Sequence, residues 1–331
     1  MTKFSTRTVL FDQTGGPEVL RIEALEPPVA GRGEVLIRVE AVGLSRADVL
    51  FRSGMFYEQP TFPGSRLGLE AAGVVEAVGE DVTEFAVGDP VFTGPGIQIS
   101  AQGVFADRVA LPVAAVIARP DTVDATTAAA AWFNYSTAYG GLLESGGLRS
   151  GDHVLITAAS GGVGSAAIQI ARRTGAVPIA VTRTEDKRRL LLEAGAAEVI
   201  VSETQDVVEE ARRITGGKGV ELVFDAVGGP GLADVAKAAA LGGTVVAYGF
   251  LDTRPMLMPV NWPLTVRGHA NTVLNSTPEG RRRVNRFLAA GLGDGSLRPV
   301  ISKVFKGLDR IQDAFRELES NTASGKIVVT L

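Results

Sequence analysis

Short runs of alternating apolar and polar residues dominate roughly the first 120 positions of the chain. The segments EVLIRVEAVGL at 34–44 and EAAGVVEAVGEDV at 70–82 are rich in valine and are punctuated by glycine. Two further runs of the same kind, VGDPVF at 87–92 and FADRVALP at 105–112, are closed by turns. Runs of this length and spacing are typical of strands, and they predict an antiparallel, barrel-like β domain.

The pattern changes after ARPDTVDATTAAAAWF at 118–133. From there, strand-like runs lie at 153–159, 176–182, 198–202, 220–229 and 244–250. Helical patterns lie between them, at 163–175, 184–196, 206–219 and 232–243. Repeated strand–helix units predict a parallel, doubly wound sheet, so the expected fold class is α/β with a second, β-rich domain. The end of the chain predicts helix, strand, helix and strand at 279–295, 300–305, 310–320 and 325–331.

Composition narrows the classes of function. The chain has 331 residues and a net charge of −4, which argues against nucleic acid or an anionic membrane as a partner. It has no cysteine, which excludes disulfides, thiolate metal sites and cysteine nucleophiles and fits a reducing, cytoplasmic location. Its two histidines, His153 and His269, lie far apart in the sequence, so structural roles are expected for both.

The sequence shows neither a signal peptide nor a run long enough to span a membrane. The opening segment MTKFSTRTVLFDQ lacks the apolar core of a signal peptide. The longest apolar run, VALPVAAVIA at 109–118, is too short to span a bilayer. We therefore expect no membrane partner.

In the stretch LITAASGGVGSAAIQI at 155–170, nearly every residue at the junction between a strand and a helix has a very small side chain or none. Within it, Gly162-Val163-Gly164 and the following Ser165-Ala166-Ala167 match the G-x-G-x-x-G/A dinucleotide fingerprint. One glycine would permit the tight turn, the next would let the backbone approach a pyrophosphate, and the small third residue would let the helix pack on the strand. Ser160 and Gly161 complete the predicted phosphate cradle at the helix N-terminus. The alternative is a tight turn that holds no ligand.

The end of the next strand indicates which dinucleotide binds. An NAD site usually has Asp or Glu there, whereas this chain has Thr182 and Arg183, followed by Lys187. A guanidinium and an ammonium suit a ribose 2′-phosphate, so NADPH is the expected cofactor. Glu185 also lies nearby, in the expected first turn of the next helix. The alternative is a solvated basic helix face.

Several motifs together resemble the medium-chain dehydrogenase/reductase superfamily, in its zinc-free quinone oxidoreductase-like branch. They are GRGEVLIRVEAVGLSRADVLFRSG, GLEAAGVVEAVGEDVTEFAVGDPVF, STAYGGLLESGGLRSGDHVLITAASGGVGSAAIQIAR, GGKGVELVFDAVGG and the closing GKIVVT. The resemblance covers nearly the whole chain. It implies a GroES-like catalytic domain over 1–125 and 268–331, with a Rossmann NADPH-binding domain inserted over 126–267.

The resemblance also bears on the metal. Zinc-dependent relatives carry a cysteine in the segment matching AVGLSRADV and a Gly-His-Glu where this chain has Gly68-Leu69-Glu70. The cysteine is missing here and Leu69 replaces the histidine, so neither metal site of those relatives is expected. Glu70 is then expected to be a structural carboxylate rather than a catalytic one.

Without a metal, a conjugated acceptor is easier to reduce than a simple ketone, because the developing charge spreads through an enolate or hydroquinone. The expected reaction is therefore hydride transfer from NADPH to a small apolar or aromatic quinone or α,β-unsaturated carbonyl. Ser45 and Tyr57 are the candidate hydrogen-bond donors, with water or a backbone N–H as competitors. Many relatives have asparagine at the position of Ser45 and tyrosine at that of Leu50, so this part of the site departs from the family pattern.

The resemblance further implies that Thr137 approaches the nicotinamide and that Tyr248, Gly249 and Phe250 follow its carboxamide side. It also implies a homodimer formed along the edge strand TVVAYGF and the segment LDTRPMLMPVNWPL that follows it. Two alternative functions stay open. One is a metal-free alcohol or aldehyde dehydrogenase, and the other is a non-catalytic NADPH-binding sensor. Seven further residues line an apolar pocket or simply fill the core: Phe51, Phe56, Phe62, Trp132, Phe133, Tyr135 and Met258.

Overall fold

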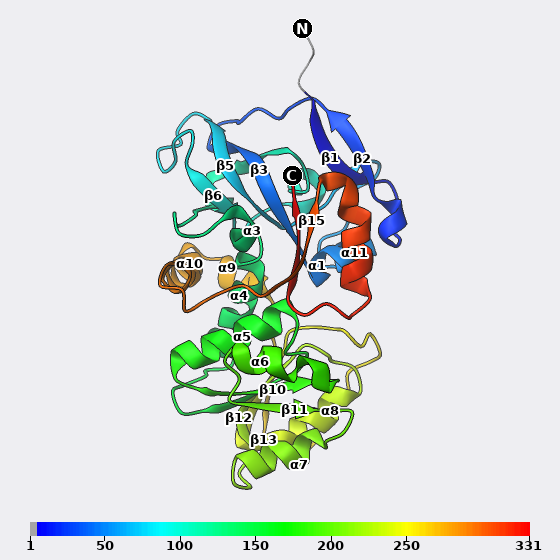
Figure 1. Ribbon diagram of the computed structural model, residues 1–331, viewed down its shortest axis with the longest axis vertical. Helices are drawn as coiled ribbons and strands as arrows, with labels where there is room; N and C mark the ends of the chain where they lie inside the picture. The colour runs from blue at the N-terminus through cyan, green and yellow to red at the C-terminus, as the bar shows by residue number, and fades with distance from the viewer. Residues whose placement is uncertain (1–4) are drawn as a thin grey trace. The chain divides into compact units, whose positions relative to one another are not determined.

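A computed structural model of the chain describes residues 5–331. It divides into two compact units (Figure 1). The first comprises Met1–Phe133 and Ile301–Leu331, of which 5–133 and 301–331 are described, and the second comprises Asn134–Val300. One unit is therefore assembled from both parts of the chain that flank the other.

The first unit is β-rich. Its larger sheet has seven strands in the order β15-β16-β3-β5-β6-β8, with β7 also paired to β3. These strands are β3 (Glu34–Leu44), β5 (Glu70–Val78), β6 (Pro90–Thr93), β7 (Arg108–Pro112), β8 (Val116–Ala118), β15 (Ile301–Lys306) and β16 (Lys326–Thr330). The smaller sheet consists of β1 (Thr6–Phe11), β2 (Arg21–Leu25) and β4 (Ser65–Arg66). All of these pairs are antiparallel except β15 with β16.

Short helices close this unit around one apolar core. They are α1 (Arg46–Arg52), α2 (Ile99–Gln102), α3 (Ala125–Ala128) and α11 (Ile311–Glu319), with single 3₁₀ turns at Pro17–Val19, Val113–Ala115 and Leu308–Arg310. The alternation seen in the sequence places the apolar side chains of β3 and β16 inside, among them Ile37 and Ile327. Phe11, Phe51 and Phe315 belong to the same core.

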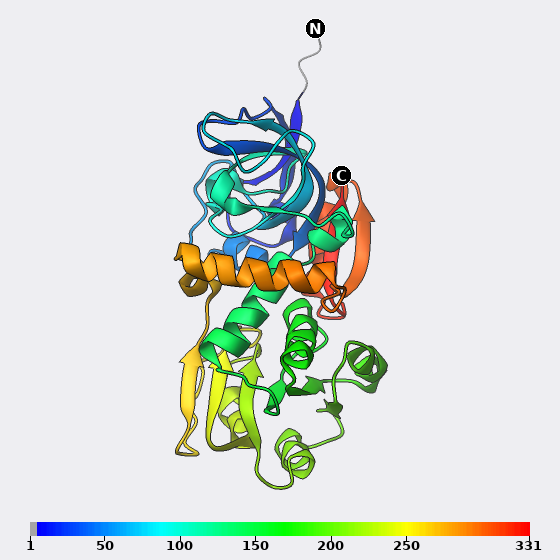
Figure 2. The same cartoon turned by 90° about the vertical axis from the view of Figure 1, so that its left-hand side faces the viewer.

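The second unit is a parallel six-stranded sheet in the order β11-β10-β9-β12-β13-β14, flanked by helices (Figures 1 and 2). Its strands are β9 (His153–Ile156), β10 (Val177–Thr182), β11 (Glu198–Val201), β12 (Val220–Asp225), β13 (Ala239–Ala247) and β14 (Thr265–Gly268). Every pairing is parallel. This is the strand order of a doubly wound dinucleotide-binding sheet, in which the order of successive strands reverses between the first strand, β9, and the fourth, β12.

The helices of this unit connect the strands in turn. They are α4 (Trp132–Tyr139), which begins in the first unit, α5 (Gly162–Thr174), α6 (Arg188–Glu193), α7 (Val207–Ile214), α8 (Gly231–Val235), α9 (Asn271–Asn275) and α10 (Pro278–Gly293). A π-helical turn covers Gly140–Ser145, and 3₁₀ turns cover Glu185–Lys187 and Ala236–Ala238. None of the helices within residues 5–331 is long and apolar enough to cross a membrane. The structure confirms the predicted α/β fold class with its doubly wound parallel sheet.

The unit boundaries differ from the predicted domain limits of 1–125, 126–267 and 268–331 at both joins. Residues 126–133 go with the first unit, because α3 packs on β3, β5 and β16. Residues 268–300 go with the second, because α9 packs on the π-helical turn and α10 packs on α9. A boundary between two folded units depends on such packing, which has no local signal in the sequence.

Two local predictions were wrong. The helix expected over 232–243 ends at Ala238, because Ala239 pairs with Val220 and begins β13. The edge of the parallel sheet is β14 rather than the TVVAYGF strand, since β14 pairs with β13 from Thr244 to Ala247. TVVAYGF is therefore an interior strand.

Candidate active site

The predicted cofactor residues lie at the carboxyl ends of the parallel strands. They form three groups: Ser160–Gly164 after β9, Thr182–Lys187 at and after β10, and Tyr248–Phe250 after β13. Because all strands of this sheet run in one direction, these groups emerge at the same edge. Ligands of open parallel sheets bind outside this edge, where the strand order reverses.

The turn between β9 and α5 is built differently from the simple fingerprint. The residue with left-handed backbone geometry is Ala158, with φ of +46°, rather than a glycine. A Cβ on Gly164 would lie 2.6 Å from Ala158 O and 2.6 Å from Ala159 Cα. Gly164 is therefore required where α5 packs against the turn that follows β9.

Gly161 is the glycine that the fold does not require. Its φ is −74°, and a Cβ there would meet only Ala158 O, at 3.4 Å. The first intrahelical bond runs from Ser165 N to Gly161 O at 2.9 Å, which leaves the amides of the first turn of α5 for an anion. Gly162, unlike Gly161, has no room for a side chain, because a Cβ there would lie 2.6 Å from the Asn134 amide nitrogen. The open space at Gly161 is what a ligand at this helix start would use.

The basic residues after β10 separate into two roles. Arg188 is held by Glu185, with Nε to Oε1 at 2.5 Å, and donates to Val199 O at 2.8 Å. Glu185 is thereby engaged, so its carboxylate is not presented to a ribose hydroxyl. Arg183 is exposed and Lys187 is half-buried, at either end of the turn that follows β10. These two cations fit a 2′-phosphate.

Asp225 ties the ends of the two strands where the order reverses, and sequence analysis missed it. Its Oδ1 accepts from Thr157 Oγ1 at 2.7 Å, and its Oδ2 accepts from Gly228 N at 2.7 Å. Thr157 Oγ1 in turn accepts from Ala226 N at 3.0 Å. Burial raises the pKa of Asp225, and the bond from Thr157 opposes this. An acidic residue directly after the apolar run VELVF was the signal for it.

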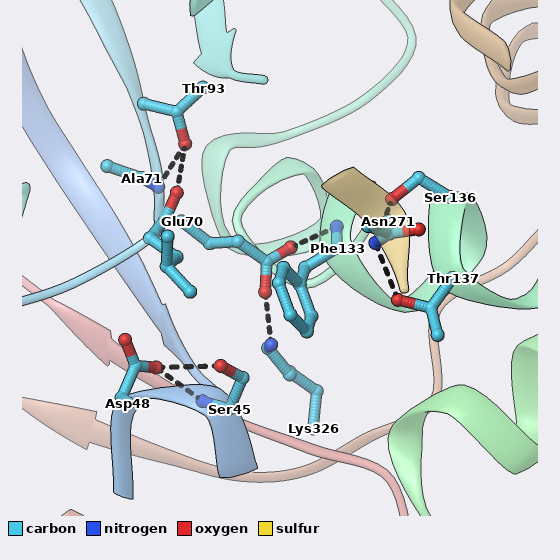
Figure 3. A network of polar contacts seen from close by, with 11 residues as sticks. Ser45, Asp48, Glu70, Ala71, Thr93, Phe133, Ser136, Thr137, Asn271 and Lys326 are labelled. Atoms are coloured by element: carbon cyan, nitrogen blue, oxygen red, sulfur yellow. Dashed lines mark hydrogen bonds and ion pairs between the residues drawn. The ribbon is translucent and has the colours of Figure 1, made fainter. Parts of the chain in front are cut away.

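Thr137 is almost buried and is fixed by a residue that the sequence did not single out. Asn271 Nδ2 donates to Thr137 Oγ1 at 2.7 Å and to Ser136 Oγ at 3.0 Å (Figure 3). Asn271 begins α9 just after β14, so it too lies at the carboxyl edge of the sheet. Tyr248 stacks on Phe224 with ring centroids 4.0 Å apart, whereas Phe250 is exposed.

In the first unit, Ser45 lies at the start of α1 and faces a carboxylate. Asp48 Oδ2 accepts from Ser45 N at 2.8 Å and from Ser45 Oγ at 2.9 Å (Figure 3). Ser45 is 6% exposed and Asp48 is 0% exposed. The spacing S-x-x-D is that of a helix capping box, which was the sequence signal for this pair.

A buried ion pair lies beside them. Lys326 Nζ donates to Glu70 Oε2, and both side chains are almost completely buried (Figure 3). Glu70 Oε1 accepts from Phe133 N at 2.8 Å. Burial raises the pKa of Glu70, and the Lys326 ammonium opposes this. Glu70 is thus a buried carboxylate with both oxygens hydrogen-bonded.

The backbone around Glu70 is held by Thr93. Its hydroxyl accepts from Ala71 N at 2.8 Å and donates to Leu69 O at 3.1 Å, on either side of Glu70 (Figure 3). Lys326 was part of the closing motif GKIVVT, but nothing in that motif indicated its partner.

Tyr57 lies elsewhere. Its side chain is 70% exposed, and its ring lies 4.2 Å from that of Phe56. The structure therefore does not bring it into the Ser45–Asp48 and Glu70–Lys326 network. Of the candidate pocket residues, Phe51 and Tyr135 are completely buried, whereas Met258 is exposed.

Comparison with known proteins agrees with this architecture. Residues 31–121 match the family described as "Alcohol dehydrogenase GroES-like domain", and residues 162–281 match "Zinc-binding dehydrogenase". A quinone oxidoreductase of Lama guanicoe is 32% identical over 98% of this chain and 97% of its own. This chain belongs to the medium-chain dehydrogenase/reductase superfamily, in its quinone oxidoreductase-like branch.

Solved structures extend the comparison. An Escherichia coli quinone oxidoreductase complexed with NADPH is 28% identical, with a TM-score of 0.88 over 98% of this chain and 100% of that one. An NAD-dependent alcohol dehydrogenase is 32% identical, with a TM-score of 0.87 over 98% and 99%. The family assignment confirms a GroES-like unit joined to a Rossmann unit, and it makes the protein an oxidoreductase.

The zinc named in one family description does not fit the residues of this chain. The chain has no cysteine, and Leu69 stands where the resemblance places the histidine of zinc-dependent relatives. Within residues 5–331, no three His, Asp or Glu side chains are grouped so that they could hold a metal ion. His269 Nδ1 pairs with Ser145 Oγ at 3.0 Å, and His153 lies 3.5 Å from Glu221. The ammonium of Lys326 is the cation beside Glu70 instead.

We expect Lys326→Met to reduce the free energy of unfolding by about 3–5 kcal/mol, because it leaves the Glu70 carboxylate buried without a cation. The double variant Lys326→Met with Glu70→Gln should recover most of this loss, since glutamine still accepts from Phe133 N. Urea unfolding of the three proteins measures both effects. The exposed pair Lys303–Glu317 provides the control, because Lys303→Met should cost less than about 1 kcal/mol. An equally small cost at Lys326 would contradict this account.

Proposed function

We propose that this oxidoreductase transfers hydride from NADPH to a quinone or an α,β-unsaturated carbonyl, and that it does so without zinc. The observation that carries the proposal is how the carboxylate of Glu70 is bonded. Its two oxygens are taken by Lys326 and by Phe133 N, and Leu69 beside it has no ligand atom. A metal therefore has too few ligands here, and the acceptor must be one that needs no Lewis acid.

NADPH fits the carboxyl edge of the parallel sheet. The first-turn amides of α5 and the space beside Gly161 suit a pyrophosphate, with Ser160, Val163 and Gly164 shaping the turn. Thr182, Arg183 and Lys187 would hold the 2′-phosphate, since Glu185 is engaged by Arg188. NADPH supplies the hydride when it is bound. The similar Escherichia coli quinone oxidoreductase complexed with NADPH supports this assignment.

Other groups of the same unit would orient the nicotinamide. Thr137 is held by Asn271, and the backbone of Tyr248, Gly249 and Phe250 continues the same edge. These groups would present one face of the ring to the acceptor and exclude water.

The acceptor is a small apolar or aromatic molecule. Hydride addition to its conjugated system leaves negative charge on oxygen, which a few hydrogen-bond donors stabilise. Ser45 is the donor that we assign to this oxygen. Tyr57, the other candidate, is 70% exposed and has no contact in the network around Ser45.

The deciding experiment follows cofactor oxidation after dialysis of the enzyme against a chelator. NADPH and NADH are each tested with a para-quinone, an enone, an aldehyde and no acceptor. We expect oxidation of NADPH with the quinone or the enone only. Lys187→Ala should weaken NADPH binding about tenfold and leave NADH unaffected, because it removes one charge from the 2′-phosphate site. Reduction of the aldehyde with NADH would favour a dehydrogenase like the NAD-dependent alcohol dehydrogenase instead, and binding without turnover would favour a sensor.

We expect Gly161→Ala to separate a phosphate cradle from a ligand-free turn. Because a Cβ meets little in the fold, the free energy of unfolding should change by less than about 0.5 kcal/mol. The same Cβ would enter the space of the pyrophosphate, so NADPH affinity measured by fluorescence titration should fall at least about tenfold. Gly231→Ala is the matched control, because a Cβ at the start of α8 meets nothing within 4 Å. Unchanged NADPH affinity in Gly161→Ala would favour the ligand-free turn.

We also propose that the protein forms a homodimer through the second unit. The edge strand β14 exposes its backbone, and the loop before it exposes large apolar side chains. These are Phe250, Leu251, Leu257, Met258, Val260 and Trp262. An uncovered strand edge beside such a loop invites aggregation, and pairing across a twofold axis covers both. Gel filtration should give twice the 34.5 kDa of one chain, and elution as a monomer would rule the dimer out.

A further inference from the structure

We propose that Asp48 holds a proton and supplies it to Ser45, so that the pair rather than the serine alone protonates the reduced substrate. Asp48 would thus be a positioning residue that acts through the Ser45 hydroxyl. The inference rests on the proposed function, because it needs a substrate oxygen that gains negative charge.

The geometry of the carboxyl group indicates that it carries a proton. Its Oδ2 lies 2.9 Å from Ser45 Oγ, and its Oδ1 is buried and has no hydrogen-bond partner among residues 5–331. An ionised carboxylate needs donors on both oxygens, and leaving one bare in the interior is costly. When ionised, Oδ2 accepts from both Ser45 N and Ser45 Oγ. With a proton on Oδ2 the bond to Ser45 Oγ reverses, so that Asp48 donates to the serine oxygen, and Oδ1 becomes a neutral carbonyl oxygen that tolerates burial better.

The charges around Asp48 agree with this state. Glu70 on β5 and Lys326 on β16 face it, and they pair with each other. The two cations of α1 itself bond elsewhere, Arg46 to Leu318 O at 2.8 Å and Arg52 to Glu319 at 2.8 Å. None of these three cations forms an ion pair with Asp48. Burial raises its pKa to about 6, and Glu70 adds to this while Lys326 and Ser45 oppose it.

Each proton moves between named oxygen atoms, beginning with the transfer of hydride. Hydride brings an electron pair to the conjugated acceptor, and its oxygen becomes an enolate or hydroquinone anion. The O–H bond of Ser45 breaks as a new O–H bond forms on that oxygen. The O–H bond of Asp48 breaks as Ser45 regains its proton, which leaves Asp48 ionised. Since Asp48 is completely buried and Ser45 is slightly exposed, Asp48 is reprotonated through Ser45 after the product leaves.

The test compares the pH profiles of kcat in the wild type, Asp48→Asn and Ser45→Ala, with NADPH and an enone. The wild-type kcat should be highest below about pH 6 and should fall about tenfold per pH unit above it, until water takes over as donor. Asp48→Asn should lack this fall, because its amide keeps the contact to Ser45 but has no proton to give. At low pH its kcat should be about a hundredfold lower, with KM for both substrates unchanged.

The Ser45→Ala variant should lose a similar factor, and the double variant should lose no more, because both residues lie on one proton path. Asp124→Asn is the matched control. Asp124 caps α3 at the surface, where asparagine caps equally well, so its pH profile should equal that of the wild type.

Stability gives a second readout that needs no turnover. Because the pKa of Asp48 is raised in the folded state, its contribution favours folding below about pH 4 and is lost as the pH rises through about 6. Asp48→Asn should remove this loss, so the stability of the variant relative to the wild type should rise between about pH 4 and about pH 6 and stay constant above that.

The outcomes are distinct. A pH-dependent wild-type kcat that Asp48→Asn makes flat and low supports the inference. Full activity in Asp48→Asn, or a wild-type kcat that is flat from about pH 5 to about pH 8, overturns it while the proposed function stands. The flat wild-type profile decides the matter even if Asp48→Asn does not fold. If no quinone or enone is reduced by the wild type, the proposed function fails, and the proton path through Ser45 is rejected with it.

Discussion

The buried ion pair between Glu70 and Lys326 is the constraint on which the β-rich unit depends. This unit is discontinuous, since one part of it precedes the parallel sheet in the chain and the other follows it. Strand β16 of the second part pairs with β3 of the first, and Lys326 at the start of β16 reaches Glu70 at the start of β5. Two charges buried in the interior are tolerated only when they are paired, so the register of these three strands is fixed along with the pair.

The same pair also supports the proposal that this chain works without zinc. Glu70 faces the ammonium of Lys326, and Leu69 stands beside it and has no ligand atom. The positive charge near the site is therefore a covalent part of the protein and is already neutralised by Glu70. A reaction that spreads its developing charge over a conjugated acceptor suits such a site better than one that concentrates it on a single alkoxide.

The parallel unit depends on a different constraint, which is the common direction of its strands. It brings the turn before α5, the basic residues after β10 and the loop after β13 to one edge. Asp225 and Thr157 then join the two central strands at that edge by short hydrogen bonds. Two glycines of this turn have different roles. Gly164 allows α5 to pack closely, whereas Gly161 leaves space at the start of α5 that no other part of the fold fills.

Much of this could be predicted from the sequence, because the features are local. Alternation and helical periodicity predicted most strands and helices, and the fingerprint located the turn before α5. The helix expected over 232–243 failed where pairing with Val220 drew Ala239 into the sheet, since a tertiary contact outweighs a local propensity.

Only the tertiary structure decided which charged groups meet. Lys326 and Glu70 are separated by most of the chain, and Asp225 and Thr157 belong to different strands, so no spacing in the sequence announces either contact. For Asp48, the sequence indicated one property and the tertiary structure decided another. Its position three residues after Ser45 indicated a capping pair, but its complete burial comes from the packing around α1. That burial raises the pKa of this capping carboxylate to about 6.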